Sequence, residues 1–276
     1  MTEESLLPKV GPQALKDISA LVARSISQPF TEEEIAKALF APDQAAVVRF
    51  DPAVGVVASL REGDQGHVRL IAVAPEARSK GFGHALVETV EVDLKEASVI
   101  TFGADPPYFL FPGVPVSETG LCYLLERHHY SREEANYNVV VNLSEIPDEP
   151  TEGGPPDASE RDAVAAWAEE HWPNWRPEFL RAFDQDSLHV VRDGNGYSGL
   201  CAFDVNRSAT LGPIASRPDL MGKGASRGLL TGALRHMREM GYSTIEVLWV
   251  APLVPYVRVG GVIGRIFFVY RKRRWT

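Results

Sequence analysis

The feature that most constrains this sequence is an internal repeat. Residues 75–83 superpose on residues 218–226 without a gap, at an offset of 143 positions, and proline, an acidic residue, lysine and glycine recur in the same order. Three further identities fall at the same offset: Ala72 with Ala215, Leu86 with Leu229 and Thr101 with Thr244. Because self-similarity at a fixed spacing marks a repeated structural unit, the sequence predicts one fold used twice.

A segment rich in proline, glycine and acidic residues, 144–156, separates the two copies. It contains few apolar side chains, which is typical of an exposed linker. We therefore expect two domains, 1–143 and 157–276, each long enough to bury a core of its own.

Hydrophobic periodicity predicts a similar order of elements in both copies. In the first copy it predicts helices over 13–26, 31–39 and 82–96, and strands over 45–60, 68–73, 99–102 and 135–143. In the second copy it predicts a helix over 159–171 and strands over 187–191, 197–203, 244–250 and 266–270. Thr31 and Glu34 have the spacing of a capping box. Strands and helices mixed in this order indicate a layered α/β or α+β domain.

The composition and the lack of targeting or metal-binding motifs argue against several classes of partner. The formal net charge is −9, from 28 basic and 37 acidic residues, so we expect no nucleic-acid partner. No apolar run reaches about 18 residues, and the N-terminus lacks a secretion signal, so we expect no membrane partner and a cytoplasmic location. Cys122 and Cys201 are too isolated for a zinc site, and we expect no metal.

A glycine-rich segment, residues 78–83, joins a predicted strand to a predicted helix. Glycine allows the backbone to approach a phosphate closely and to adopt positive φ angles. The first N–H groups of the following helix have no partner within it, and the helix dipole adds positive potential there. Together with the guanidinium of Arg78 and the ammonium of Lys80, the segment suits a pyrophosphate.

Two common phosphate-binding motifs do not account for this segment. A P-loop requires GxxxxGK[ST], which is absent from the sequence. A dinucleotide fingerprint requires GxGxxG or GxGxxA, and Leu86 stands at its last position. The segment also follows several strands and helices instead of opening a βαβ unit, and neither motif explains Arg78.

The segment resembles the signature of the GNAT superfamily of N-acetyltransferases, Arg/Gln-x-x-Gly-x-Gly/Ala, which opens a helix after a strand ending in an apolar-x-Val-x-Pro run. Residues 71–75 and 78–83 meet every position. The resemblance covers each half of the chain. It implies two tandem GNAT-like domains, each with a mixed, mostly antiparallel sheet flanked by helices.

The resemblance also implies acetyl-coenzyme A (acetyl-CoA) as the acyl donor. In the family, backbone amides of this loop hold the pyrophosphate and the strand edge before it pairs with the pantetheine. The implied cofactor-binding residues are Ile71, Ala72, Val73, Arg78, Ser79, Lys80, Gly81, Phe82, Gly83 and His84. The second copy departs from the signature, because Met221 replaces the arginine and Ser226 the last glycine. We expect a degenerate loop there, with cofactor binding in residues 1–143.

The catalytic residues are harder to assign. In the family the acid is often a tyrosine four residues before a glycine, which fits Tyr256 before Gly260, whereas the first copy has Leu125 at this position. Tyr123 and His129 lie near enough in sequence to substitute. The candidates are therefore Tyr256, Tyr123 and His129, each with the alternative of packing in a core or facing solvent.

Two functions remain open at this stage. The first is an N-acetyltransferase that moves an acetyl group from acetyl-CoA to a primary amine of a small molecule, as a monomer or homodimer. The second is a non-catalytic acyl-CoA-binding or scaffold protein. The aromatic, proline-rich residues 106–115 are expected either to wall an acceptor site or to pack against the other domain.

Overall fold

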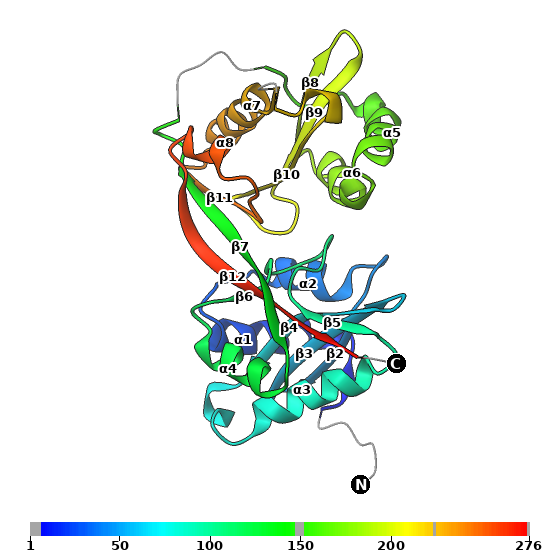
Figure 1. Cartoon of the computed structure of the whole chain (residues 1–276), viewed down its shortest axis with the longest axis vertical. Helices are drawn as coiled ribbons and strands as arrows, with labels where there is room; N and C mark the ends of the chain where they lie inside the picture. Colours follow the sequence, from blue (N-terminus) through cyan, green and yellow to red (C-terminus); the bar gives the residue numbers. More distant parts are fainter. Residues whose placement is uncertain (1–6, 147–151, 223–224, 275–276) are drawn as a thin grey trace. The chain divides into compact units, whose positions relative to one another are not determined.

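The computed structural model describes residues 7–146, 152–222 and 225–274. Residues 147–151 of the predicted linker, Lys223 and Gly224 of the second loop, and the acidic N-terminus lie outside the described residues. The chain divides into two compact units (Figure 1). Unit 1 contains the chain up to Asn136 and from Phe267 onward, and unit 2 contains Tyr137–Ile266.

Unit 1 is a mixed α/β layer structure. Its strands are β1 (Lys9–Val10), β2 (Val47–Asp51), β3 (Gly55–Glu62), β4 (Gln65–Val73), β5 (Val99–Phe102) and β6 (Val114–Pro115), with parts of β7 (Ser131–Asn142) and β12 (Val262–Arg273). Its helices are η1 (Pro12–Ala14), α1 (Leu15–Ser25), α2 (Glu32–Phe40), η2 (Pro75–Ala77), α3 (Phe82–Asp93) and α4 (Thr119–Arg127). The strand order is β1-β2-β3-β4-β5-β12, with β6 paired to β12. The capping box at Thr31 and Glu34 is confirmed at the start of α2.

Unit 2 repeats this plan. Its strands are β8 (Leu188–Asp193), β9 (Gly196–Phe203), β10 (Thr210–Ser216) and β11 (Thr244–Val247), with the remaining parts of β7 and β12. Its helices are η3 (Ala158–Glu160), α5 (Arg161–His171), η4 (Pro173–Trp175), α6 (Arg176–Asp184), η5 (Pro218–Leu220), α7 (Ala225–Glu239) and α8 (Val254–Val257). Most strand pairs are antiparallel, while β4–β5 and β10–β11 are parallel. No described helix is long and apolar enough to cross a membrane.

The predicted repeat is present in the structure. The 3-10 turns η2 and η5 begin 143 residues apart, and so do helices α3 and α7. The offset then grows to 145, because β5 begins at Val99 and β11 at Thr244. Thr101 is therefore not the structural counterpart of Thr244, although the two match in the gapless alignment. Helix α7 is three residues longer than α3, and the connection to the next strand is one residue shorter.

The two copies exchange their last strands. β7 pairs with β11 of unit 2, with Val141 opposite Ile245, and β12 pairs with β5 of unit 1, with Tyr270 opposite Phe102. The division by contacts thus differs from the expected 1–143 and 157–276, because residues from Phe267 onward return to unit 1. Periodicity identifies a strand near 266–270, but it carries no information about which sheet that strand joins.

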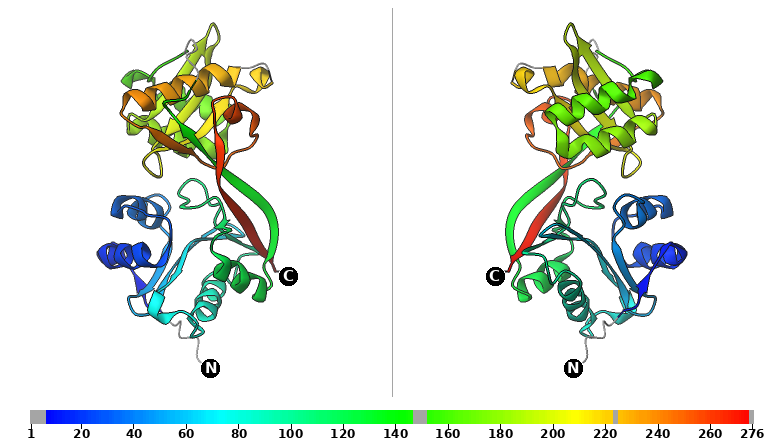
Figure 2. Two further views of the ribbon diagram at one scale, coloured as in Figure 1. Left: turned by 90° about the vertical axis from the view of Figure 1, so that its left-hand side faces the viewer. Right: turned by 90° about the vertical axis from the view of Figure 1, so that its right-hand side faces the viewer.

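A β-bulge in β4 sets the two faces of the unit 1 sheet. Ala58 lies opposite Leu70, and the next residue of β3, Ser59, lies opposite Val68, so Arg69 is the extra residue. The bulge lets Val68 and Leu70 face opposite sides although they are two positions apart. Leu70 packs in the core beneath α1 and α2, and Val68 in the core beneath α3 and α4. The two pairs of helices cover opposite faces of the unit 1 sheet (Figure 2).

Arg69 forms a buried ion pair with Asp105, and both side chains are almost fully excluded from solvent. The Arg69 guanidinium also donates to the carbonyls of Ala38, at 3.0 Å, and Gln44, at 2.8 Å. The ring of Tyr108 lies 5.6 Å from the guanidinium carbon. Arg69 therefore connects the bulge of β4 to α2 and to the segment that follows β5.

We predict that Arg69→Met lowers the free energy of unfolding by about 3–5 kcal/mol, because it leaves the Asp105 carboxylate buried without a countercharge. Urea denaturation followed by circular dichroism measures the change. The double variant Arg69→Met/Asp105→Leu should be less destabilised than the sum of the single changes. Additive losses would show that the two side chains do not depend on each other.

Candidate functional site

Unit 1 contains a cavity of about 750 Å³. Its walls come from β4, the loop after it, the start of α3, the segment between β5 and α4, and the first part of α4. Two residues at the end of α1, Ser25 and Ile26, complete it. All the lining residues fall between positions 25 and 124, so the site belongs to the first copy alone.

The cavity follows from the separation of two parallel strands. β4 pairs with β5 from Gln65 opposite Val99 to Val68 opposite Phe102, and no pairing between them is found beyond this point in the described chain. The N–H of Ala74 donates to the carbonyl of Val54 at 2.9 Å, so the backbone of Ala74 and Ala72 faces β3. Because backbone groups alternate along a strand, those of Ile71 and Val73 face the cavity.

The loop after β4 has a positive φ angle at Gly81, as glycine allows, and a second one at Ser79, where the sequence carries no such signal. Ser79 and Gly81 have φ angles of 59° and 85°, so two residues of the loop are left-handed. Gly81 precedes α3, and the first N–H that bonds back into the helix is that of Ala85, 3.3 Å from the Gly81 carbonyl. The N–H groups before Ala85 open toward the cavity at the positive end of the helix dipole.

Gly83 lies where a side chain would meet a neighbour. A Cβ atom at this position would be 3.1 Å from Leu124 Cδ2, on α4. The absence of a side chain keeps this wall of the cavity open. Of the predicted cofactor residues, Lys80 and Phe82 do not line the cavity, whereas the others do: Ile71, Ala72, Val73, Arg78, Ser79, Gly81, Gly83 and His84. Phe82 instead packs at the edge of the core beneath α1 and α2.

Arg78 is tied to the end of α1. Its Nη2 donates to the Ser25 carbonyl at 2.5 Å, at the negative end of that helix. We expected its guanidinium to contact the pyrophosphate directly. In the structure at least one of its N–H groups fixes the loop against α1, so Arg78 also positions the backbone.

The predicted catalytic residues of unit 1 lie in different environments. Tyr123, on α4, lines the cavity and is 62% exposed. His129 follows α4, is exposed, has a φ angle of 62° and does not line the cavity. Leu125 is fully buried in the core beneath α3 and α4. Only Tyr123 is therefore placed to meet a ligand in this cavity.

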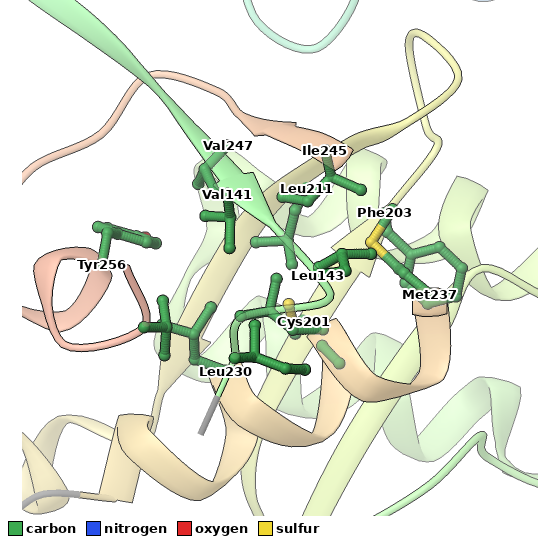
Figure 3. Packing of buried hydrophobic residues seen from close by; sticks show 14 of the residues in the cluster. Val141, Leu143, Cys201, Phe203, Leu211, Leu230, Met237, Ile245, Val247 and Tyr256 are labelled. Atoms are coloured by element: carbon green, nitrogen blue, oxygen red, sulfur yellow. The ribbon is translucent and has the colours of Figure 1, made fainter. Parts of the chain in front are cut away.

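Tyr256 lies in the hydrophobic core of unit 2, on α8 (Figure 3). Its side chain is 6% exposed, and burial raises the pKa of its hydroxyl. It does not line the cavity of unit 1. This placement is that of a core aromatic, one of the two alternatives that the sequence left open.

Sequence reasoning missed Glu118. It is the carboxylate among the described residues that line the cavity, and it occupies the position before α4. Its Oε1 accepts a hydrogen bond from the Ser27 hydroxyl at 3.2 Å. A glutamate before an unpredicted helix carries no recognisable signal, because α4 has neither a capping motif nor a long apolar pattern.

The segment from Gly103 to Gly113 contributes to the cavity wall through Gly103, Phe111 and Gly113. A Cβ atom on Gly103 would lie 2.7 Å from Gly113 Cα, so the two ends of the segment touch through glycines. Between them, Asp105 is held by Arg69, and the Tyr108 hydroxyl donates to Asp43 at 2.5 Å. Phe111 lines the cavity and contacts Phe30 edge-on.

The corresponding strand edge of unit 2 is already occupied. The N–H of Arg217 donates to Ser198 on the β9 side, so the backbone of Ser216 faces away from β9, as that of Val73 faces away from β3. The Ser216 carbonyl accepts a hydrogen bond from the Trp172 indole at 3.0 Å. Met221, in place of Arg78, is 62% exposed.

A strand edge exposed by the divergence of two parallel strands, followed by a left-handed loop and a helix N-terminus, is the arrangement that the sequence motif implied. Residues 16–106 match the acetyltransferase (GNAT) family model. The family match is confined to that segment, and the chain as a whole has the fold of tandem GNAT proteins.

Three solved structures illustrate the likeness. The glucosamine N-acetyltransferase region of a fungal multi-domain β-N-acetylglucosaminidase has 20% identity and a TM-score of 0.80, over 97% of this chain and 38% of that one. An N-acetyltransferase from Sphaerobacter thermophilus has 18% identity and a TM-score of 0.71, over 97% and 95%. A tandem GNAT protein from the clavulanic acid biosynthesis pathway has 13% identity and a TM-score of 0.69, over 96% and 97%. No curated protein sequence matches this chain.

We predict that Tyr256→Phe leaves acetyl-CoA binding within about twofold of wild type, because the hydroxyl lies in the core of unit 2. Calorimetric titration measures the affinity. A loss of binding in a variant with an unchanged melting temperature would mean that Tyr256 acts on the cofactor site.

Proposed function

We propose that this protein is an N-acetyltransferase that binds acetyl-CoA in the cavity of unit 1 and transfers the acetyl group to a primary amine of a small molecule. One observation carries the proposal. The free backbone edge of Ile71 and Val73 and the amide-rich start of α3 open into the same cavity. An extended amide chain and a pyrophosphate, joined in one molecule, match these two surfaces.

The residues present fit such a donor. The pantetheine of acetyl-CoA carries amide groups that can pair with a strand edge, as an added strand would. The pyrophosphate suits the N–H groups around Gly81 and Gly83. The thioester would then lie near Tyr123, Leu124 and the strand edge, where a backbone N–H can polarise its carbonyl.

Glu118 gives the site its chemistry toward an amine. A carboxylate in the cavity attracts an ammonium group and can take up its proton, directly or through a water molecule. The neutral nitrogen then forms a bond to the carbonyl carbon, and the C–S bond breaks as the thiolate leaves. The nitrogen is positively charged after the attack and loses its second proton to solvent. The Tyr123 hydroxyl is the group in the cavity that we assign to donate a proton to that thiolate.

A second candidate function follows from Leu125. The position where the family often has its acid carries a buried leucine, and a protein with this site can bind an acyl-CoA without transferring the acyl group. Release of free thiol in the presence of an amine separates the enzyme from the binder. The amine panel should include diamines, arylalkylamines, amino acids and glucosamine. Glucosamine is included because the similar fungal structure is described as a glucosamine N-acetyltransferase region.

We predict that Gly81→Asp weakens acetyl-CoA binding at least about tenfold relative to Gly81→Asn. Both side chains tolerate a left-handed residue and enter open space, so they differ mainly in the charge beside the pyrophosphate. Calorimetric titration of the two variants isolates that charge.

The matched control lies in the second copy. Gly222 corresponds to Ser79, has a φ angle of 75° and also faces open space. Gly222→Asp should leave the affinity and the stoichiometry of one site unchanged. Two sites in the wild type, or weakening only in Gly222→Asp, would place the cofactor in unit 2, and no binding at all would refute the proposed function.

We predict that Glu118→Gln lowers kcat/KM for the amine about 100-fold, because the amide neither attracts the ammonium nor accepts its proton. The affinity for acetyl-CoA should stay within about twofold. Ser27→Ala removes the hydrogen bond to Glu118 but keeps the carboxylate, so its effect should be much smaller. Equal rates for Glu118→Gln and wild type would remove Glu118 from the mechanism.

A further inference from the structure

A pair of histidines stands at the edge of the proposed cofactor site. His84, in the first turn of α3, lines the cavity. Its Nδ1 lies 3.0 Å from Nε2 of His128, the C-cap residue that follows α4. At this distance one ring must donate and the other accept, so the pair shares a single proton between the two nitrogens. Because Nδ1 of His84 is engaged with His128, Nε2 is the ring nitrogen of His84 that can contact a ligand.

The charges around the pair are mixed. Glu88 and Glu91 lie on α3, and Lys272 of β12 forms an ion pair with Glu91 at 2.8 Å. Burial is the main influence on His128 and lowers its pKa below the usual value. Glu91 and Glu88 oppose this shift, whereas His84 and Lys272 add to it. Burial therefore favours the neutral form of His128 when no ligand is bound.

Proton position decides what His84 presents to an anion. If His84 donates from Nδ1 and the pair is neutral, its Nε2 is a bare lone pair that repels a phosphate. If the pair gains a proton, His84 keeps its bond to His128 and also presents an N–H and a positive charge. An imidazolium that donates to a phosphate forms a charge-assisted bond, which is stronger than a neutral one.

We propose that His84 and His128 form a phosphate subsite for the pyrophosphate of the acyl donor, and that the pair takes up one proton when the pyrophosphate binds. The subsite rests on the proposed function, because it requires acetyl-CoA in this cavity. His84 lies three residues after Gly81, in the turn of α3 whose N–H groups face the same anion. His128 acts through His84, as the partner that stabilises its cationic form.

The sign of the pH dependence follows from this uptake. A complex that holds an extra proton is favoured by acid, so the association constant rises as pH falls, by up to about tenfold per unit. The 3′-phosphate of acetyl-CoA also titrates, near pH 6, and would confuse the measurement. Acetyl-3′-dephospho-CoA keeps the pyrophosphate and lacks this group, so it is the probe of choice.

The test is calorimetric titration of the full chain with this probe at pH 6, 7 and 8, in two buffers of different ionisation enthalpy. We expect proton uptake on binding and an affinity about tenfold higher at pH 6 than at pH 8. His84→Gln and His128→Gln keep a hydrogen-bonding side chain but cannot be charged, so both should abolish the uptake. His171→Gln, in unit 2, should retain it.

Three outcomes separate the claims. Binding without proton uptake, or uptake that persists in both glutamine variants, overturns the subsite and leaves the proposed function intact. Uptake with acetyl-CoA but not with the dephospho probe overturns the assignment to the pyrophosphate. No binding of either compound at any pH overturns the proposed function itself, and the subsite with it.

Discussion

The site depends on the divergence of β4 from β5. The two strands pair for four residues and then separate where Arg69 bulges out of β4. Beyond the bulge, the backbone of Ile71 and Val73 has no strand to bond, and a cavity opens beside it. Unpaired backbone groups in a sheet are costly unless water or a ligand satisfies them, so a ligand that resembles a strand suits this edge.

The buried ion pair of Arg69 and Asp105 holds this divergence in place. Asp105 follows β5, and Arg69 binds it while donating to two carbonyls near α2. The contact of Gly103 with Gly113 closes the segment between them, and Phe111 projects from it into the cavity. A charge pair that stabilises the fold modestly can thus fix the geometry of a wall that a ligand would meet.

Sequence reasoning reached much of this structure because its strongest signals were local. The capping box at Thr31 and the positive φ angle at Gly81 depend on neighbouring residues, and the repeat depends on the similarity of two short segments. All three are present in the structure. The exchange of β7 and β12 depends on pairing between distant segments, which one sequence does not encode in any readable pattern. The hydrogen bond between His84 and His128 escaped for the same reason. Glu118 escaped because the helix that follows it has no local signal in the sequence.

The two copies differ at the same strand edge. Both have the 3-10 turn, the helix after it and a parallel strand pair that diverges. In unit 1 the carbonyl of Val73 faces an open cavity, whereas in unit 2 the equivalent carbonyl of Ser216 is bound by Trp172. An indole that satisfies this edge removes the reason for a ligand to bind there. The second copy then needs no arginine at this position of its loop, which is consistent with Met221 in the place of Arg78.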